Sequence, residues 1–139
     1  MARILGIDVG ERRIGIAVST PEGGLAVPLR ILESRGEEAD IAAIIEIARA
    51  EGVEALVVGD PRTLAGEAGA QARRVDAFAG RLAEASGLPV ARWDERLTSV
   101  QASRRPPGAG KRGSTGPADD VAAAIILQAY LDRERSRGR

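Results

Sequence analysis

The order of the apolar segments constrains the fold of this chain more than any other feature of its sequence. Three strand-like runs come first, at Ile4–Ile7, Ile14–Val18 and Leu25–Leu32. The first two are short and are joined by a tight turn near Gly10, so they predict a hairpin. Pro28 lacks a backbone donor, which predicts that the third strand lies at a sheet edge or carries a bulge.

Helices and strands alternate after this meander. Helical spacing of apolar residues predicts helices at Glu37–Glu51, Ala68–Ser86 and about Pro117–Leu131, with buried strands at Ala55–Val58 and Val90–Trp93. The residues expected to point inward are Ile41, Ile44, Ile45 and Ala48 in the first helix and Val75, Phe78, Ala79 and Leu82 in the second. A meander followed by two strand-helix crossovers predicts an α/β fold with a mixed five-stranded sheet flanked by helices. The 139 residues fit a single domain, residues 1–139.

The residue types that the chain lacks limit its chemistry. It contains no cysteine and no histidine, which excludes thiolate nucleophiles, Ser-His-Asp triads and the usual zinc sites. Hard divalent ions such as Mg²⁺ and Mn²⁺ prefer oxygen ligands, and the chain has 20 acidic residues. The formal net charge is zero, which excludes a uniformly basic coat for nucleic acid but allows a local basic patch.

The N-terminal sequence enters the first strand-like run almost at once. No signal-peptide pattern precedes that run, and no apolar run is long enough to cross a bilayer. We therefore expect a cytoplasmic protein that does not act at a membrane.

Three carboxylates lie where the predicted strands and helices begin or end. Asp8 closes the first strand, Glu95 follows the fifth, and Asp119 heads an apolar face of the last helix. Each has a structural alternative, respectively a turn residue, a surface ion pair and a favourable charge at a helix N-terminus. Together they can converge at one edge of the sheet and hold two divalent ions. Asp94 and Asp120 compete for the second and third positions.

A basic segment separates the last two of these acids. Residues 96–118 contain no acid, and residues 104–116 are rich in proline and glycine, which predicts a flexible loop. Such a loop can attract a phosphate backbone, although an ordinary solvated loop remains the alternative. The basic tail at residues 133–139 is expected to fray. The basic side chains of the segment are Arg96, Arg104, Arg105, Lys111 and Arg112.

Several motifs resemble those of one family, in the same order and over nearly the whole chain. Ile4–Gly10 followed by Arg13–Ser19 resembles the opening hairpin of the YqgF family, also called RuvX. Val57–Pro61 resembles its middle strand and loop, Asp94–Ala102 its most distinctive box, and Asp119–Leu131 its closing helix. The resemblance implies an RNase H-like fold related to the Holliday junction resolvase RuvC.

The resemblance also implies a function. It predicts a metal-dependent nuclease that acts in 5′-end maturation of pre-16S rRNA, with Holliday junction resolution in DNA repair as the alternative. The expected catalytic and metal-binding residues are Asp8, Glu95 and Asp119, with two Mg²⁺ or Mn²⁺ ions. The expected partner is structured RNA or branched DNA, bound by a monomer or a homodimer. The side chains expected to bind nucleic acid are Arg13, Arg96, Arg104, Arg105, Lys111 and Arg112.

Other functions and one further acid stay open. An ATPase or sugar kinase of the actin-like superfamily also begins with such a hairpin, but it needs two lobes, and this chain is long enough for one. A non-catalytic nucleic-acid-binding module is the second alternative. Asp60 stands where the family commonly has leucine; we expect it to be a turn residue before Pro61, with a fourth metal-binding carboxylate as the alternative.

Overall fold

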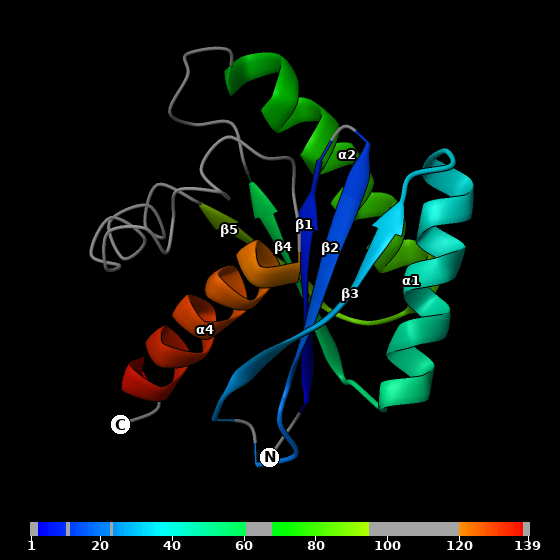
Figure 1. Cartoon of the computed structure of the whole chain (residues 1–139). Coiled ribbons are helices and arrows are strands. Elements are labelled where there is room, and N and C mark those ends of the chain that lie inside the picture. Colours follow the sequence, from blue (N-terminus) through cyan, green and yellow to red (C-terminus); the bar gives the residue numbers. More distant parts are fainter. Residues whose placement is uncertain (1–2, 11, 23, 61–67, 95–119, 138–139) are drawn as a thin grey trace.

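The computed structural model describes residues 3–10, 12–22, 24–60, 68–94 and 120–137. Five strands and three helices make up this part of the chain (Figure 1). In chain order they are β1 (Ile4–Val9), β2 (Arg13–Ser19), β3 (Ala26–Glu33), α1 (Glu37–Glu51), β4 (Ala55–Asp60), α2 (Ala68–Ser86), β5 (Val90–Asp94) and α4 (Asp120–Arg137).

The strands form one mixed sheet in the order β3-β2-β1-β4-β5. The first three strands pair antiparallel, as predicted for a meander, and β4 pairs parallel to both β1 and β5. Helices α1 and α2 cover one face of the sheet and α4 covers the other (Figure 1). The predicted α/β class and the mixed five-stranded sheet are thus confirmed.

Alternation along β1 divides its side chains between the two faces. Leu5 and Ile7 are fully buried on the side of α1 and α2, so the intervening positions face α4. At Gly6 a Cβ atom would stand 2.8 Å from Cβ of Leu127 and 3.2 Å from the backbone oxygen of Ala123. Glycine at this position therefore lets α4 lie directly against the centre of the sheet.

Strand β3 lies at the sheet edge, as Pro28 predicts. The register between β2 and β3 shifts between Ile16, which pairs with Arg30, and Ala17, which pairs with Pro28. Pro28, which has no backbone donor, therefore lies in an edge strand and next to an irregularity in the ladder.

The inward-facing residues follow the prediction with one exception. All four residues expected to point inward from α2 are buried. In α1 the buried stripe runs through Ile41, Ile44, Ile47 and Ala48, whereas Ile45 is only partly buried at its margin. Ile45 still packs against the same core, and the stripe also includes Ile47, three residues beyond Ile44, which the prediction did not name.

Two predicted boundaries were also wrong. β4 does not end before Asp60, because this residue still pairs with Asp94 of β5, so the ladder continues through the expected turn. The tail is not frayed from Arg133, because α4 continues to Arg137. Arg135 donates a hydrogen bond to the backbone oxygen of Gly24, 3.1 Å away, which fastens the helix end to the β2–β3 turn. The predicted loop at 104–116 lies outside the described residues.

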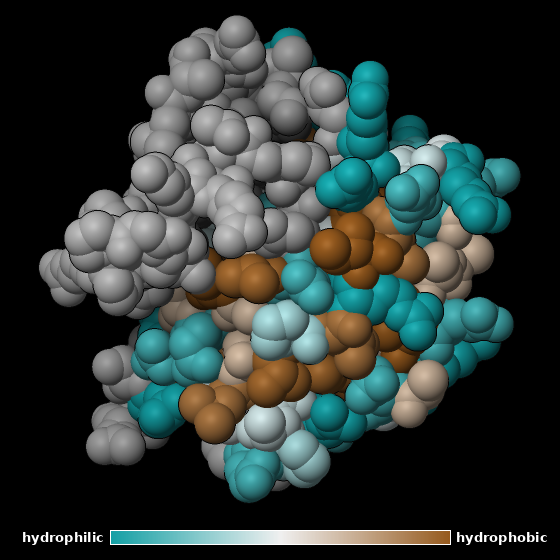
Figure 2. Space-filling view, viewed as in Figure 1, coloured by the Kyte–Doolittle hydropathy of each residue, from teal (hydrophilic) through white to brown (hydrophobic). Residues whose placement is uncertain are grey.

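None of the described helices is both long and apolar enough to span a bilayer. The face shown in Figure 2 has hydrophobic residues interrupted by hydrophilic ones. The exposed hydrophobic side chains among the described residues include Leu25, Val27 and Ile31 of the β2–β3 hairpin and Val121 of α4.

Candidate active site

Asp8 is the second-last residue of β1, and only 4% of its surface is exposed. It pairs with Gly15 of β2 on one side and with Gly59 of β4 on the other. Directly paired residues project on the same face of a sheet. Neither of these two paired residues contributes a side chain, and two ladders of backbone hydrogen bonds hold the Asp8 backbone.

The same row continues across the sheet to β5. Gly59 pairs with Trp93, which is buried and packs with Ala17, Val57 and the apolar residues of α4. Asp8 thus lies on the face that α4 covers. Helix α4 begins near the middle of the sheet and runs toward the end at which β1 starts (Figure 1), so its N-terminal end is the end directed toward the Asp8 side.

The sheet topology bears on where the other two predicted acids join the described part of the chain. β1, β4 and β5 are parallel, so their C-terminal ends lie at one edge of the sheet. Glu95 directly follows β5 and Asp119 directly precedes the described start of α4. Both residues lie outside the described part of the chain, so their convergence with Asp8 stays a prediction. Within the described ranges, no group of three or more Asp, Glu, His or Cys residues could hold a metal ion.

The competing acids have defined backbone positions. Gly59, rather than Asp60, stands opposite Asp8 in the parallel ladder. Asp60 is instead the last residue of β4 and pairs with Asp94. Asp120 is the first described residue of α4 and is half-buried. A role for any of these three acids in metal binding stays untested.

Arg13 is the one predicted nucleic-acid-binding residue that the described ranges contain. It begins β2 and its side chain is exposed. Its backbone oxygen accepts a hydrogen bond from Gly10 N, 2.9 Å away, which closes the β1–β2 turn at the Asp8 end of the sheet. The other five predicted residues, Arg96, Arg104, Arg105, Lys111 and Arg112, lie outside the described residues.

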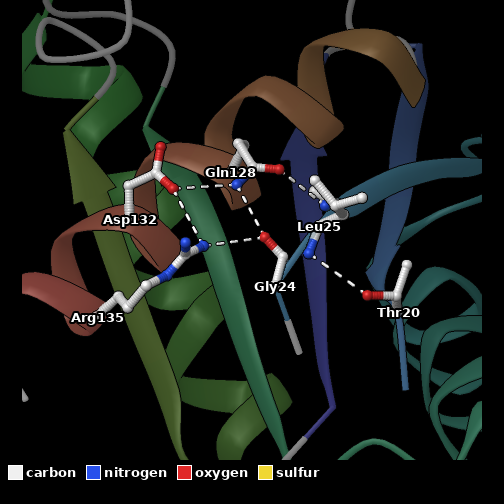
Figure 3. Close-up of polar contacts among 7 residues, drawn as sticks. Thr20, Gly24, Leu25, Gln128, Asp132 and Arg135 are labelled. Atoms are coloured by element: carbon white, nitrogen blue, oxygen red, sulfur yellow. Dashed lines mark hydrogen bonds and ion pairs between the residues drawn. The ribbon is translucent and has the colours of Figure 1, made fainter. Parts of the chain in front are cut away.

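A polar cluster that the sequence analysis missed ties α4 to the β2–β3 turn (Figure 3). Gln128 Oε1 accepts a hydrogen bond from Ala26 N at 2.9 Å, and its Nε2 donates to the oxygen of Gly24 at 3.2 Å. Nε2 also donates to Asp132, 3.1 Å away, and Asp132 lies 3.5 Å from Arg135. The available signal was a glutamine inside the apolar run that precedes Tyr130.

Aromatic contacts join strand β5 to helix α4. The rings of Trp93 and Tyr130 meet edge to face, with centroids 6.2 Å apart and an interplanar angle of 85°. The guanidinium carbon of Arg133 lies 5.7 Å from the Trp93 ring centroid, a favourable cation–π geometry. These contacts hold α4 near the β5 edge of the sheet, and the Gln128 cluster holds it near the β3 edge.

Comparison with known proteins identifies close relatives of the whole chain. A family model described as "RuvX: Holliday junction resolvase" matches residues 2–133. A protein of Moorella thermoacetica is 46% identical over 138 residues, which cover 98% of this chain and 99% of that protein. A protein of Chloroflexus aurantiacus is 45% identical over 135 residues, which cover 96% of this chain and 88% of that protein. Both carry the name "Putative pre-16S rRNA nuclease".

Solved structures share the fold at low sequence identity. RuvC of T. thermophilus in complex with a Holliday junction substrate matches with a TM-score of 0.68 and 18% identity, over 99% of this chain and 97% of that one. The fowlpox virus Holliday junction resolvase matches with a TM-score of 0.53 and 11% identity, over 94% and 99%. These matches confirm the expected RNase H-like architecture.

Proposed function

Because this chain belongs to the RuvX family, we propose that it is a divalent-metal-dependent nuclease that hydrolyses phosphodiester bonds during 5′-end maturation of pre-16S rRNA. The names of relatives that are 45–46% identical over almost the whole chain support this substrate. The structural observation that carries the proposal is Asp8, a buried carboxylate between two glycines at the edge where the parallel strands end.

The residues at this edge fit a hard divalent ion. Carboxylate oxygens are preferred ligands of Mg²⁺ and Mn²⁺, and a chain without histidine or cysteine offers no softer set. Asp8, Glu95 and Asp119 would hold the metal, two ions in the arrangement we propose. Bound divalent ions supply an activated water and charge stabilisation at the phosphate.

The chain's own contributions are positioning and binding. The two ladders around β1 fix the Asp8 carboxyl group, so little reorganisation is needed when substrate arrives. The paired residues Gly15 and Gly59 add no side chains of their own on either side of Asp8. Arg13 and the basic segment 96–118 hold the neighbouring phosphates and take no part in bond cleavage.

The family description and the RuvC-like fold favour a second candidate, a Holliday junction resolvase. Symmetric resolution of a junction needs two active sites, so this function would require a homodimer. The processing of a single RNA strand does not require a second active site.

One experiment separates these functions. The full-length protein is incubated with Mg²⁺ or Mn²⁺ and either an RNA that contains the pre-16S 5′ region or a four-way DNA junction of matched length. We expect cleavage of the RNA, and loss of cleavage in excess EDTA. Symmetric cleavage of the junction alone would assign the resolvase function. Binding of both substrates without cleavage would assign a non-catalytic module.

A further inference from the structure

A pocket of about 400 Å³ opens on the face of the sheet opposite Asp8. The end of β1, the start of β2, the connection from β3 to α1, and helices α1 and α2 line it. Val9 and Gly10 contribute to its wall. Because Val9 directly follows Asp8 in β1, its side chain projects on the opposite face of the sheet. The pocket therefore belongs to the same end of the sheet as the candidate catalytic carboxylate, although neither the catalytic prediction nor the predicted basic loop involves it.

The lining combines apolar walls with donors and acceptors. Ile14 and Phe78 belong to the buried core beneath the pocket, and Ala77 contributes a small side chain that is exposed. Glu37 and Arg74 add an acceptor and a donor at the polar side. Small-molecule sites of this size combine apolar walls with a few placed polar groups, and this lining offers apolar and polar residues in about equal number.

The polar side of the pocket is held in place by the protein itself. Asp40 is 6% exposed, and its two oxygens accept hydrogen bonds from Ser34 Oγ at 2.6 Å and from Arg35 N at 2.9 Å. Glu37 forms an ion pair with Arg81. The lining also carries two guanidinium groups, which balance its two carboxylates, so it has no net charge that would favour a phosphate group. A nucleobase suits such a lining, because its edges carry both hydrogen-bond donors and acceptors.

We propose that this pocket takes an unpaired nucleobase of the strand whose backbone reaches Asp8. The inference rests on the proposed nuclease function and specifies its substrate further, as a nucleic acid that is single-stranded beside the cleavage site. A strand that passes around the C-terminal end of β1 meets Asp8 on one face and the pocket on the other. A base within a duplex is stacked and paired, and its edges are not available to such a pocket.

The first test fills the pocket with a larger side chain. Ala77→Phe narrows the pocket, whereas Ala85→Phe places the same side chain at an exposed position of α2 that does not line it. Binding of a fluorescein-labelled single-stranded RNA is measured by anisotropy without divalent ions, so that no cleavage occurs. We expect Ala77→Phe to weaken binding about tenfold, the usual effect of losing one base contact. The Ala85→Phe protein should bind as the wild type does.

The second test uses charge and does not depend on how Ala77→Phe folds. Arg73 and Arg74 are adjacent and both exposed, but only Arg74 lines the pocket. We expect Arg74→Ala to weaken binding of the single-stranded RNA more than Arg73→Ala does. Equal losses would mean general attraction to phosphate and would overturn the proposal.

The third test removes the base from the probe. An abasic ribose-phosphate strand of the same length should bind the wild type more weakly than ordinary RNA, and the Ala77→Phe protein should bind the two strands equally. Wild-type protein that binds both strands equally would overturn the base pocket. The nuclease proposal has a separate outcome: RNA that binds with this pattern but is not cleaved with Mg²⁺ or Mn²⁺ would overturn that proposal and leave the base pocket standing.

Discussion

At the scale of single residues, the carboxyl group of Asp8 is the feature on which the proposed chemistry depends. Replacing it by the nearly isosteric amide, Asp8→Asn, keeps the shape but removes the charge that attracts a divalent ion. We expect cleavage to fall by more than about 100-fold, since even partners that only orient a metal ligand contribute 10- to 100-fold. Cleavage of the pre-16S substrate and thermal unfolding are measured on the same preparation.

Asp76→Asn is the matched control for this substitution. Asp76 lies in α2 and is 65% exposed in an ion pair with Arg92, and such surface pairs contribute little to stability. Its amide variant should cleave as the wild type does. An Asp8→Asn protein with normal activity would remove Asp8 from the site, whereas loss of cooperative unfolding would assign it a structural role.

Adding one methyl group should have opposite effects on stability at two glycines, Gly6 and Gly80. Gly6→Ala brings a Cβ atom to 2.8 Å from Leu127 Cβ, so α4 must move, and such overpacking typically costs about 1–3 kcal/mol. Gly80 lies in the interior of α2 with nothing within 4 Å of an added Cβ. Gly80→Ala should therefore stabilise the protein by up to about 1 kcal/mol. Urea unfolding of both variants measures the difference; equal effects would contradict the close approach of α4 to β1.

At the scale of secondary structure elements, the Gln128 cluster determines how α4 is held against the sheet. Gln128→Ala leaves the backbone N–H of Ala26 without its side-chain acceptor and leaves the oxygen of Gly24 with Arg135 as its remaining side-chain donor. We expect a loss of about 1–3 kcal/mol in the free energy of unfolding. Thr20→Ala is the control, since Thr20 Oγ1 accepts a long, 3.4 Å hydrogen bond from Leu25 N in an exposed turn. A Gln128→Ala protein as stable as the wild type would mean that apolar packing alone holds α4.

The sequence predicted these elements well wherever periodicity and turn residues agree. Apolar runs and turns located all five strands, and Pro28 predicted an edge or a bulge at β3, where the structure has an edge strand with a register shift. The end of β4 was wrong because Gly59-Asp60-Pro61 is a typical turn sequence, whereas pairing with β5 keeps Asp60 extended. The extension of α4 to Arg137 was missed because its anchor, Gly24, lies more than a hundred residues away.

The candidate site was predictable only in part, for a similar reason. Asp8 is evident as an acid at the end of an apolar strand. The two glycines beside it are separated from it in sequence, and only the strand register shows that they flank it. The pocket beside Val9 was not predictable, because its walls come from segments that meet only in the tertiary structure.

At the scale of the whole molecule, a net charge of zero requires that nucleic acid be bound by a local concentration of basic residues. The segment 96–118 has five basic residues and no acid, and it lies between two predicted catalytic acids. Arg104 and Arg105 are adjacent in it, so changing both to Ala removes two potential phosphate contacts. Each contact releases condensed counterions on binding, which steepens the dependence of affinity on salt.

The double variant Arg104→Ala/Arg105→Ala should therefore weaken RNA binding across sequences. The slope of log affinity against log salt concentration should flatten by about 1.4–1.8 units, because each of the two phosphate contacts contributes roughly 0.7–0.9. Turnover at saturating substrate should fall much less, since contacts that bind ground state and transition state equally affect KM rather than kcat. Arg30→Ala/Arg49→Ala is the matched control, because it removes the same charge from two exposed positions in β3 and α1. If both double variants change the slope equally, the protein binds RNA through diffuse charge, and the segment 96–118 has no special role in holding the strand.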